Sequence, residues 1–150
     1  MYKLISSGLG IGYIPKGGGT VASAVCCLAI YLALPAGEQF GLLSSVSITI
    51  ILFTLGLLSS YKVEAAWGKD NYRVVIDEIA GMWVSMLFIP QTLVLLVTGF
   101  ILFRFFDIVK PLYIRRMESL AGGTGVMMDD VLAGVYTNLI LQIALAYNLF

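Results

Sequence analysis

Long apolar runs, separated by short polar segments, dominate the hydropathy pattern of the chain. Four runs cover residues 20–34, 41–60, 79–106 and 131–150. A helix that crosses a bilayer needs about 20 apolar residues, or somewhat fewer where neighbouring helices bury it. The runs at 41–60 and 131–150 fit directly, and the shorter run at 20–34 fits a crossing in a locally thinned bilayer. The pattern predicts an all-α, polytopic membrane helical bundle.

The run at 79–106 is too long for one crossing, because a single helix from Asp77 to Asp107 would be about 45 Å long. Pro90 interrupts it, so the alternative is two shorter helices that form a hairpin. With the hairpin, all nine basic residues fall on the N-terminal side, whereas one kinked helix would divide them between both sides. The positive-inside rule favours the hairpin. We therefore expect about five short membrane segments, with the N-terminus inside and the C-terminus outside.

Composition agrees with a membrane protein. Hydrophobic residues make up 59% of the chain and charged residues 12%, and the mean hydropathy is +0.95. One soluble core of this size cannot hide so much apolar surface. The formal net charge is zero, so no global basic field indicates a nucleic-acid partner. No linker or low-complexity tract divides the chain, and we expect a single membrane-embedded domain over residues 1–150.

The expected topology gathers nearly all charges at the cytoplasmic face, where residues 61–78 and 107–130 would lie. The basic residues are Lys3, Lys16, Lys62, Lys69, Arg73, Arg104, Lys110, Arg115 and Arg116. The acidic residues at this face are Glu64, Asp70, Asp77, Glu78, Asp107, Glu118, Asp129 and Asp130, which leaves Glu38 outside. The segment 111–120 carries Arg115 and Arg116 beside apolar residues, and we expect it to lie on lipid headgroups.

In each of two acidic pairs, one carboxylate lies four residues before a glycine. The pairs are Asp77-Glu78 and Asp129-Asp130, with Asp77 four residues before Gly81 and Asp130 four residues before Gly134. We expect each pair in the first turn of a membrane helix, with the glycine on the face of one carboxylate, where a second helix can approach closely. Taken alone, each pair is more typical of acids that complement the positive end of a helix dipole than of a functional site.

A third polar group stands at the end of the run at 79–106. Arg104, Asp107 and Lys110 follow i, i+3, i+6 spacing and predict one polar ridge, for which a surface ion-pair ladder is the alternative. Together with the acidic pairs, five carboxylates would converge at one side of the bundle and repel one another. The chain has no histidine, and hard oxygen ligands suit Mg²⁺, with Mn²⁺ as a possible substitute. Arg104 and Lys110 would then hold a phosphate.

A glycine run precedes the first long apolar stretch. Gly17, Gly18 and Gly19 before Thr20 predict an anion-binding nest of backbone N–H groups at a helix N-terminus. The alternative is a flexible linker that ends in a Thr N-cap. A similar run at 122–125 is expected to form a loop before Asp129.

Three blocks in fixed order resemble the bacterial phosphatidylglycerophosphatase A family. They are Asp77-Glu78-Ile79-Ala80-Gly81, Phe103-Arg104-Phe105-Phe106-Asp107-Ile108-Val109-Lys110-Pro111 and Gly125-Val126-Met127-Met128-Asp129-Asp130. The resemblance covers nearly the whole chain. It implies Mg²⁺-dependent hydrolysis of the phosphomonoester of phosphatidylglycerophosphate to phosphatidylglycerol and phosphate, at the cytoplasmic face of the bacterial inner membrane.

The resemblance and the residue patterns together assign roles. The metal ligands are expected among Asp77, Glu78, Asp107, Asp129 and Asp130, which with Arg104 and Lys110 form the catalytic set. Substrate contacts are expected from Gly18, Gly19, Thr20, Arg104, Lys110, Arg115 and Arg116. Water activated by the metal is favoured over an aspartate as the group that attacks phosphorus.

Two other readings fit parts of the pattern. A metal-dependent CDP-alcohol phosphotransferase would share the acidic, membrane-bound site, but its Asp-Gly-x-x-Ala-Arg signature is missing. A cation channel or transporter would use the acidic residues for selectivity. Acids at helix ends rather than at midspan, with Arg104 and Lys110 among them, weigh against the channel.

Overall fold

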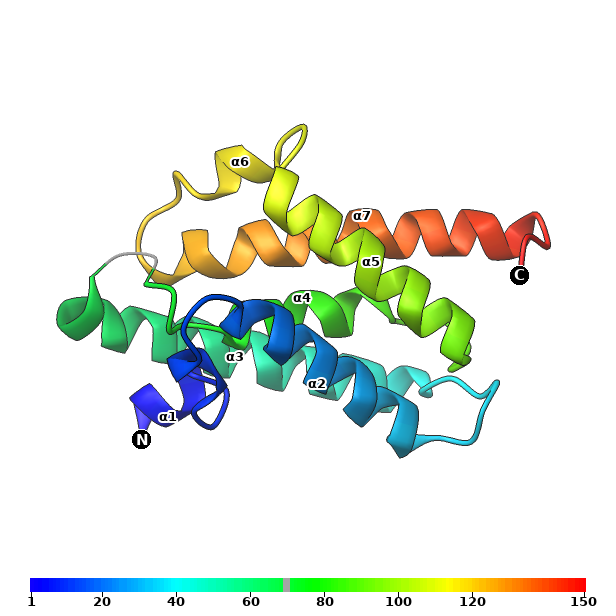
Figure 1. Ribbon diagram of the computed structural model, residues 1–150, viewed down its shortest axis with the longest axis horizontal. Coiled ribbons are helices and arrows are strands. Elements are labelled where there is room, and N and C mark those ends of the chain that lie inside the picture. The colour runs from blue at the N-terminus through cyan, green and yellow to red at the C-terminus, as the bar shows by residue number, and fades with distance from the viewer. Residues whose placement is uncertain (69–70) are drawn as a thin grey trace.

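The computed structural model describes residues 1–68 and 71–150, and within these ranges it contains helices and no strand (Figure 1). Lys69 and Asp70, expected among the cytoplasmic charges, lie outside the described residues. The elements are α1 (Tyr2–Ser6), the 3-10 helix η1 (Ile11–Tyr13), α2 (Gly18–Ala33), α3 (Leu42–Trp67), α4 (Ile76–Ser85), α5 (Leu93–Val109), α6 (Ile114–Met117) and α7 (Gly123–Ala146). The all-α prediction is confirmed.

Two helices in the described ranges, α3 and α7, are long and apolar enough to cross a membrane. The 26 residues of α3 extend about 39 Å, which exceeds the hydrocarbon thickness of a bilayer. Only 17% of its most apolar 18-residue window is buried in the protein, whereas the core helix of a soluble protein would be mostly covered. The exposed face of α3, with Leu43, Ile50 and Leu58, therefore suits contact with lipid.

The start of α7 differs from the prediction. The helix begins at Gly123, so Asp129 and Asp130 lie inside it rather than in its first turn, and residues 123–125 are helical rather than part of a loop. Close packing explains the difference. A Cβ atom at Gly123 would lie 2.8 Å from the Tyr61 backbone N of α3, so the glycine allows a contact that offsets its weak helix propensity.

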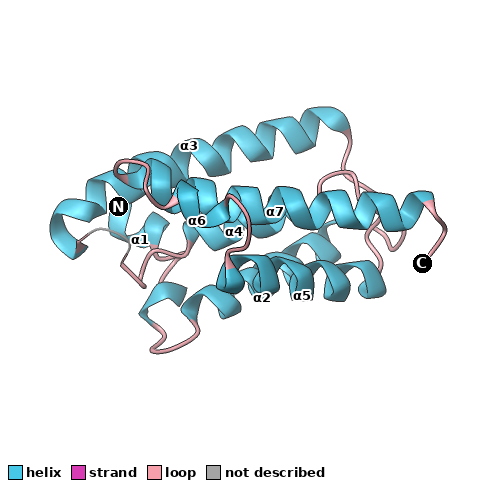
Figure 2. Cartoon of the chain, turned by 90° about the horizontal axis from the view of Figure 1, so that it is seen from above, coloured by secondary structure: helices cyan, strands magenta, loops and turns pink. Residues whose placement is uncertain are grey.

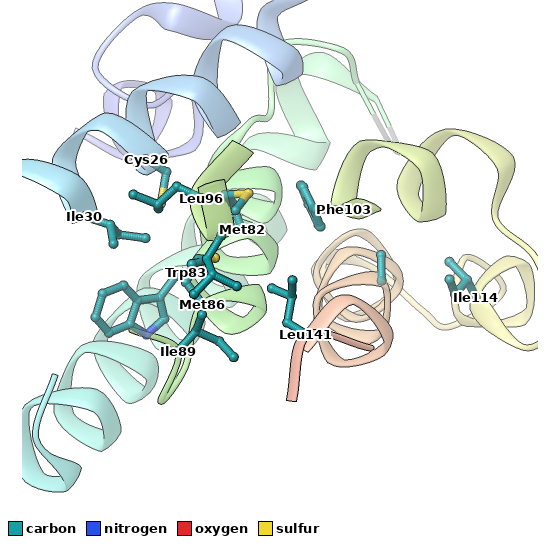
Figure 3. Close-up of a cluster of buried hydrophobic side chains, with 12 residues drawn as sticks. Cys26, Ile30, Met82, Trp83, Met86, Ile89, Leu96, Phe103, Ile114 and Leu141 are labelled. Carbon is teal, nitrogen blue, oxygen red and sulfur yellow. The ribbon is translucent and has the colours of Figure 1, made fainter. Parts of the chain in front are cut away.

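Helix α4 lies inside the bundle and contacts α2, α3, α5 and α7. Figure 2 shows α3 on one side of the molecule and the neighbouring helices α2 and α5 on the other. Met82, Trp83 and Met86 of this part of the chain pack with Leu96 of α5 and Leu141 of α7 in the main hydrophobic cluster (Figure 3). Because α4 is enclosed, the residues at its N-terminal turn are held rigidly against several helices.

The apolar stretch around Pro90 is broken into α4 and α5 rather than continuous. Polar side chains of α7 satisfy the backbone at the break: Asn138 Nδ2 donates to the carbonyls of Ser85 (3.1 Å) and Leu87 (2.8 Å). On the other side, the Gln91 N–H donates to the Glu38 carbonyl at 2.7 Å. The turn therefore lies beside the α2–α3 connection, at the opposite end of α4 from the acidic residues.

Candidate functional site

Three carboxylates form an acidic cluster where α4 meets α7. Asp77 and Glu78 stand in the first turn of α4, as expected, and Asp130 comes from α7. One oxygen of each residue lies within 4.8 Å of the others. Asp77 and Asp130 are buried, with exposed fractions of 8% and 4%. Burial removes water from the charged groups and makes their mutual repulsion expensive unless a cation lies among them.

The glycines after the acidic pairs create this cluster. A Cβ atom at Gly81 would lie 2.6 Å from the backbone carbonyl O of Asp130, and one at Gly134 would collide with the Gly81 carbonyl. The two helices consequently cross with their backbones nearly in contact, which places Asp77 and Asp130 side by side. The prediction that these glycines bring a second helix to the acids is confirmed.

The other two carboxylates expected to bind metal lie next to the cluster and contact basic residues. Asp107 Oδ2 lies 2.6 Å from Arg104 Nη1 in an i, i+3 ion pair on α5, close enough to Glu78 and Asp130 to interact with their charges. Asp129 Oδ2 lies 2.6 Å from Lys110 Nζ. The structure thus groups three acids directly and places Asp107 and Asp129 around them.

Lys110 does not continue the expected ridge on α5. It is the C-cap of the helix, with a left-handed backbone (φ 48°), so its side chain leaves the face of Arg104 and Asp107. Its ammonium group donates to Asp129 (2.6 Å) and Glu118 (2.7 Å). Burial by itself lowers the pKa of Lys110, but the two carboxylates raise it by more than burial lowers it. The pKa of Lys110 therefore lies above its usual value, and the side chain stays charged.

A cavity of about 490 Å³ opens beside the acidic cluster. Its lining comes from the glycine run and the residue before it, from the connection between α3 and α4, from α4 and from α5, and includes Lys16, Gly17, Gly18, Gly19, Tyr72, Glu78 and Arg104. Gly19 is so close to the Glu78 carboxylate that a Cβ atom would collide with it. The glycine run and Glu78 therefore share one site, although they belong to different helices, α2 and α4.

The backbone at this cavity presents the start of α2. Gly17 is the N-cap, with φ 108°, and the alternative of a Thr N-cap is wrong because Thr20 already lies within the helix. The first N–H groups of an α-helix have no acceptor within the helix, and the helix dipole adds positive potential there. The cavity thus combines backbone donors from Gly18 and Gly19 with the side chain of Arg104, a combination that suits a phosphate group.

Some expected substrate contacts lie elsewhere. Arg115 and Arg116 are exposed on α6, where the Arg116 guanidinium lies 4.9 Å from the centre of the Tyr113 ring. The Thr20 side chain is also exposed and is not part of the cavity lining. Conversely, sequence reasoning missed Lys16 and Tyr72 as cavity residues. The only signal for Lys16 was its place beside the glycine run.

The donor set suits a hard divalent cation. Asp77, Glu78 and Asp130 offer carboxylate oxygens at the mutual spacing of metal ligands, and such oxygens are what Mg²⁺ and Mn²⁺ prefer. Glu78 Oε2 is buried and, within the described residues, has no hydrogen-bond partner. A buried carboxylate oxygen in this state is costly, and coordination to a cation would offset that cost.

Comparisons with known proteins agree with these features. The model of the family described as "Phosphatidylglycerophosphatase A" matches residues 4–145. A relative from Bacteroides thetaiotaomicron, named "Putative phosphatidylinositol-3-phosphatase", is 41% identical over 94% of this chain and 91% of its own length. A protein named "Phosphatidylglycerophosphatase A" from Haemophilus influenzae is 36% identical over 89% of this chain and 82% of its own length. Another protein of that name, from Escherichia coli, is 31% identical over 89% of this chain and 77% of its own length.

No solved structure matches the chain. The family match nevertheless extends over nearly all of the sequence and includes the acidic cluster, the Arg104–Asp107 ion pair and Lys110 with Asp129. The chain belongs to the phosphatidylglycerophosphatase A family.

Proposed function

We propose that this protein hydrolyses the phosphomonoester of phosphatidylglycerophosphate and releases phosphatidylglycerol and inorganic phosphate. Family membership supports this reaction. The observation that carries it is that Glu78, one of the three clustered acids, lines a cavity that Arg104 and the glycine run also line. A phosphate dianion in this cavity would meet positive groups while its phosphorus faces the carboxylates.

We propose Mg²⁺, with Mn²⁺ as a substitute, as the cation of the acidic cluster. Asp77, Glu78 and Asp130 would hold it, and Asp107 and Asp129 would stand beside it. When bound, such a cation polarises the phosphate and lowers the pKa of water. The enclosed helix α4 keeps Asp77 and Glu78 of the cluster in place.

The cations of the chain would have different roles. Arg104 lines the cavity, and its two-pronged guanidinium suits the nonbridging oxygens of a phosphate, whose charge grows in the transition state. Lys110 is held by Asp129 and Glu118, so we assign it to positioning Asp129 rather than to contacting the phosphate directly. Lys16 and the first N–H groups of α2 would complete the anion site.

We propose a multi-pass arrangement in the bacterial inner membrane, with about five segments and the cavity at the cytoplasmic face. The charged ends of α3, α5 and α7 lie at the same end of the molecule as the start of α4 (Figure 1). Helix α4 has ten residues and is about 15 Å long, which is too short to cross the bilayer alone. Together with the segment that leads to the turn at Pro90, it would reach the other side. Arg115 and Arg116 on exposed α6 would then contact lipid headgroups.

A second candidate substrate is phosphatidylinositol 3-phosphate, which the name of the 41% identical Bacteroides relative indicates. This lipid also carries a phosphomonoester on a polar headgroup, so the same acidic cluster and Arg104 would serve both reactions. The difference lies in the size of the alcohol that must fit the cavity of about 490 Å³.

A substrate panel tests the proposal. Purified protein in detergent is incubated with phosphatidylglycerophosphate, phosphatidylinositol 3-phosphate or phosphatidic acid, and released phosphate is measured. We expect phosphatidylglycerophosphate to give the highest kcat/KM, and Asp130→Asn to abolish release. Higher kcat/KM for the inositol lipid would favour the second candidate, and no release from any lipid would contradict a phosphatase function.

A further inference from the structure

A second concave surface, an apolar groove of about 270 Å³, runs between α2 and α5. Its lining includes Ala24, Leu28 and Tyr31 from α2 and Leu93, Val97 and Phe100 from α5. Each set follows i, i+4, i+7 spacing, so each forms a single face of its helix. The groove is therefore built by two regular helix faces that meet along their lengths.

The groove lies end to end with the polar cavity. Arg104, in the cavity wall, stands four residues after Phe100 and thus one turn further along the same face of α5, a rise of about 6 Å. On α2, Gly17 in the cavity wall lies seven residues before Ala24, again on the same face. The two helices run in opposite directions, so both polar ends meet at the cavity and both apolar parts extend away from it.

We infer that this groove holds one acyl chain of the phospholipid substrate while its phosphorylated headgroup occupies the cavity. The inference rests on the proposed function. The occupant must be amphipathic, with a phosphate at one end and an apolar chain that starts within about one helical turn of it. A phospholipid has this shape, and the small side chain of Ala24 leaves room where its chain would enter the groove.

The direction of the groove also matches a lipid in a bilayer. With the cavity at the membrane surface, α5 extends from the part that contributes Arg104 to the cavity toward the opposite end of the helix bundle, where the helix begins (Figure 1). A substrate chain could then stay parallel to its neighbours in the bilayer while its headgroup reaches the acidic cluster. The enzyme would not need to lift the lipid out of the membrane.

Ala24→Trp tests the inference by filling the groove with an indole ring. Ala29→Trp is the matched control, because Ala29 is also exposed on α2 but lies about 140° around the helix and does not line the groove. We expect Ala24→Trp to lower kcat/KM for dipalmitoyl phosphatidylglycerophosphate at least about tenfold. The deacylated headgroup, glycerophosphoglycerophosphate, should be hydrolysed equally by both variants and the wild type.

Photo-crosslinking provides a second readout that does not depend on activity. A phosphatidylglycerophosphate with a diazirine in one acyl chain should label α2 and α5 around Ala24 and Val97 more strongly than the exposed face of α3, and Ala24→Trp should reduce that label. If Ala24→Trp also loses hydrolysis of the deacylated headgroup, its kinetics no longer report on the groove. The crosslinking pattern of the wild type then tests whether the acyl chain lies between α2 and α5.

Equal kcat/KM of the two tryptophan variants on the long-chain lipid, or labelling spread evenly over α2, α5 and α3, would overturn the groove inference. The proposed function would survive either result, provided that the wild type releases phosphate. Absence of phosphate release by the wild type, together with labelling concentrated at the groove, would instead contradict the proposed function and support the lipid site.

Discussion

At the residue scale, Arg104 joins the acidic cluster to the cavity. Its guanidinium binds Asp107 at 2.6 Å and also lines the space beside Glu78. The arginine side chain is mostly buried, with 16% of it exposed, so water screens this ion pair little. The ion pair therefore holds the side chain in place. A fixed donor of this kind stabilises charge that develops in a transition state without further reorganisation.

Replacement of Arg104 by Ala should lower kcat for phosphatidylglycerophosphate by about two or more orders of magnitude. Arg104→Lys keeps the charge but loses the two-pronged geometry, so we expect an intermediate kcat. Lys62→Ala removes an exposed charge from α3 and should leave kcat unchanged. Steady-state kinetics check all three, and full activity of Arg104→Ala would remove the arginine from the phosphate site.

The sequence predicts the acidic part of the site better than its cationic part. Asp77, Glu78 and Asp130 belong to compact motifs whose glycines indicate a close helix contact, although Asp130 lies inside α7 rather than in its first turn. Lys16 and Tyr72 reach the cavity from connecting segments, whose course depends on tertiary packing rather than on local periodicity. Lys110 departs from the helix because its backbone is left-handed, and spacing along the sequence does not reveal that conformation.

At the element scale, the crossing of α4 and α7 fixes the distances between carboxylates. Gly81 lies against both the Asp130 carbonyl and the ring of Phe103. An added methyl group would meet backbone and a buried aromatic ring, neither of which can move without separating helices. The site therefore depends on a glycine that has no chemical role of its own.

Gly81→Ala should lower stability, because overpacking costs about 1–3 kcal/mol and the better helix propensity of alanine offsets only about 1 kcal/mol of that cost. It should also reduce phosphate release, since Asp77 and Asp130 move apart. Gly99→Ala is the control: its methyl group would meet the flexible Met86 side chain, which can shift. Thermal unfolding in detergent compares the two, and equal midpoints would mean that the α4–α7 contact is looser than described.

Element boundaries were only partly predictable. Apolar length predicts α2 and α3, and Pro90 predicts the break between α4 and α5, because proline cannot donate the helical hydrogen bond. The early start of α7 was not predictable, because its glycines favour a loop until they pack against α3. Asn138 likewise has no evident role in its apolar run until its hydrogen bonds to the carbonyls of Ser85 and Leu87 are seen.

At the scale of the whole molecule, the chain separates a charged end from an apolar end. The Glu38 backbone and the turn at Gln91 meet at one end, and the acidic cluster lies at the other. Reporter fusions after Gly68 and after Glu118 should therefore report the cytoplasm, and a fusion after Glu38 the opposite side. Opposite locations for the first two fusions would rule out the hairpin topology and a cytoplasmic cavity.

The most direct test of the acidic cluster is phosphate release from phosphatidylglycerophosphate before and after removal of divalent metal. EDTA should reduce release by the wild type to background, and added Mg²⁺ or Mn²⁺ should restore it, because the clustered carboxylates of Asp77, Glu78 and Asp130 require a cation to hold a phosphate dianion nearby. Asp130→Asn should stay inactive after the metal is added back. Release that EDTA leaves unchanged would contradict a metal-dependent mechanism at this cluster.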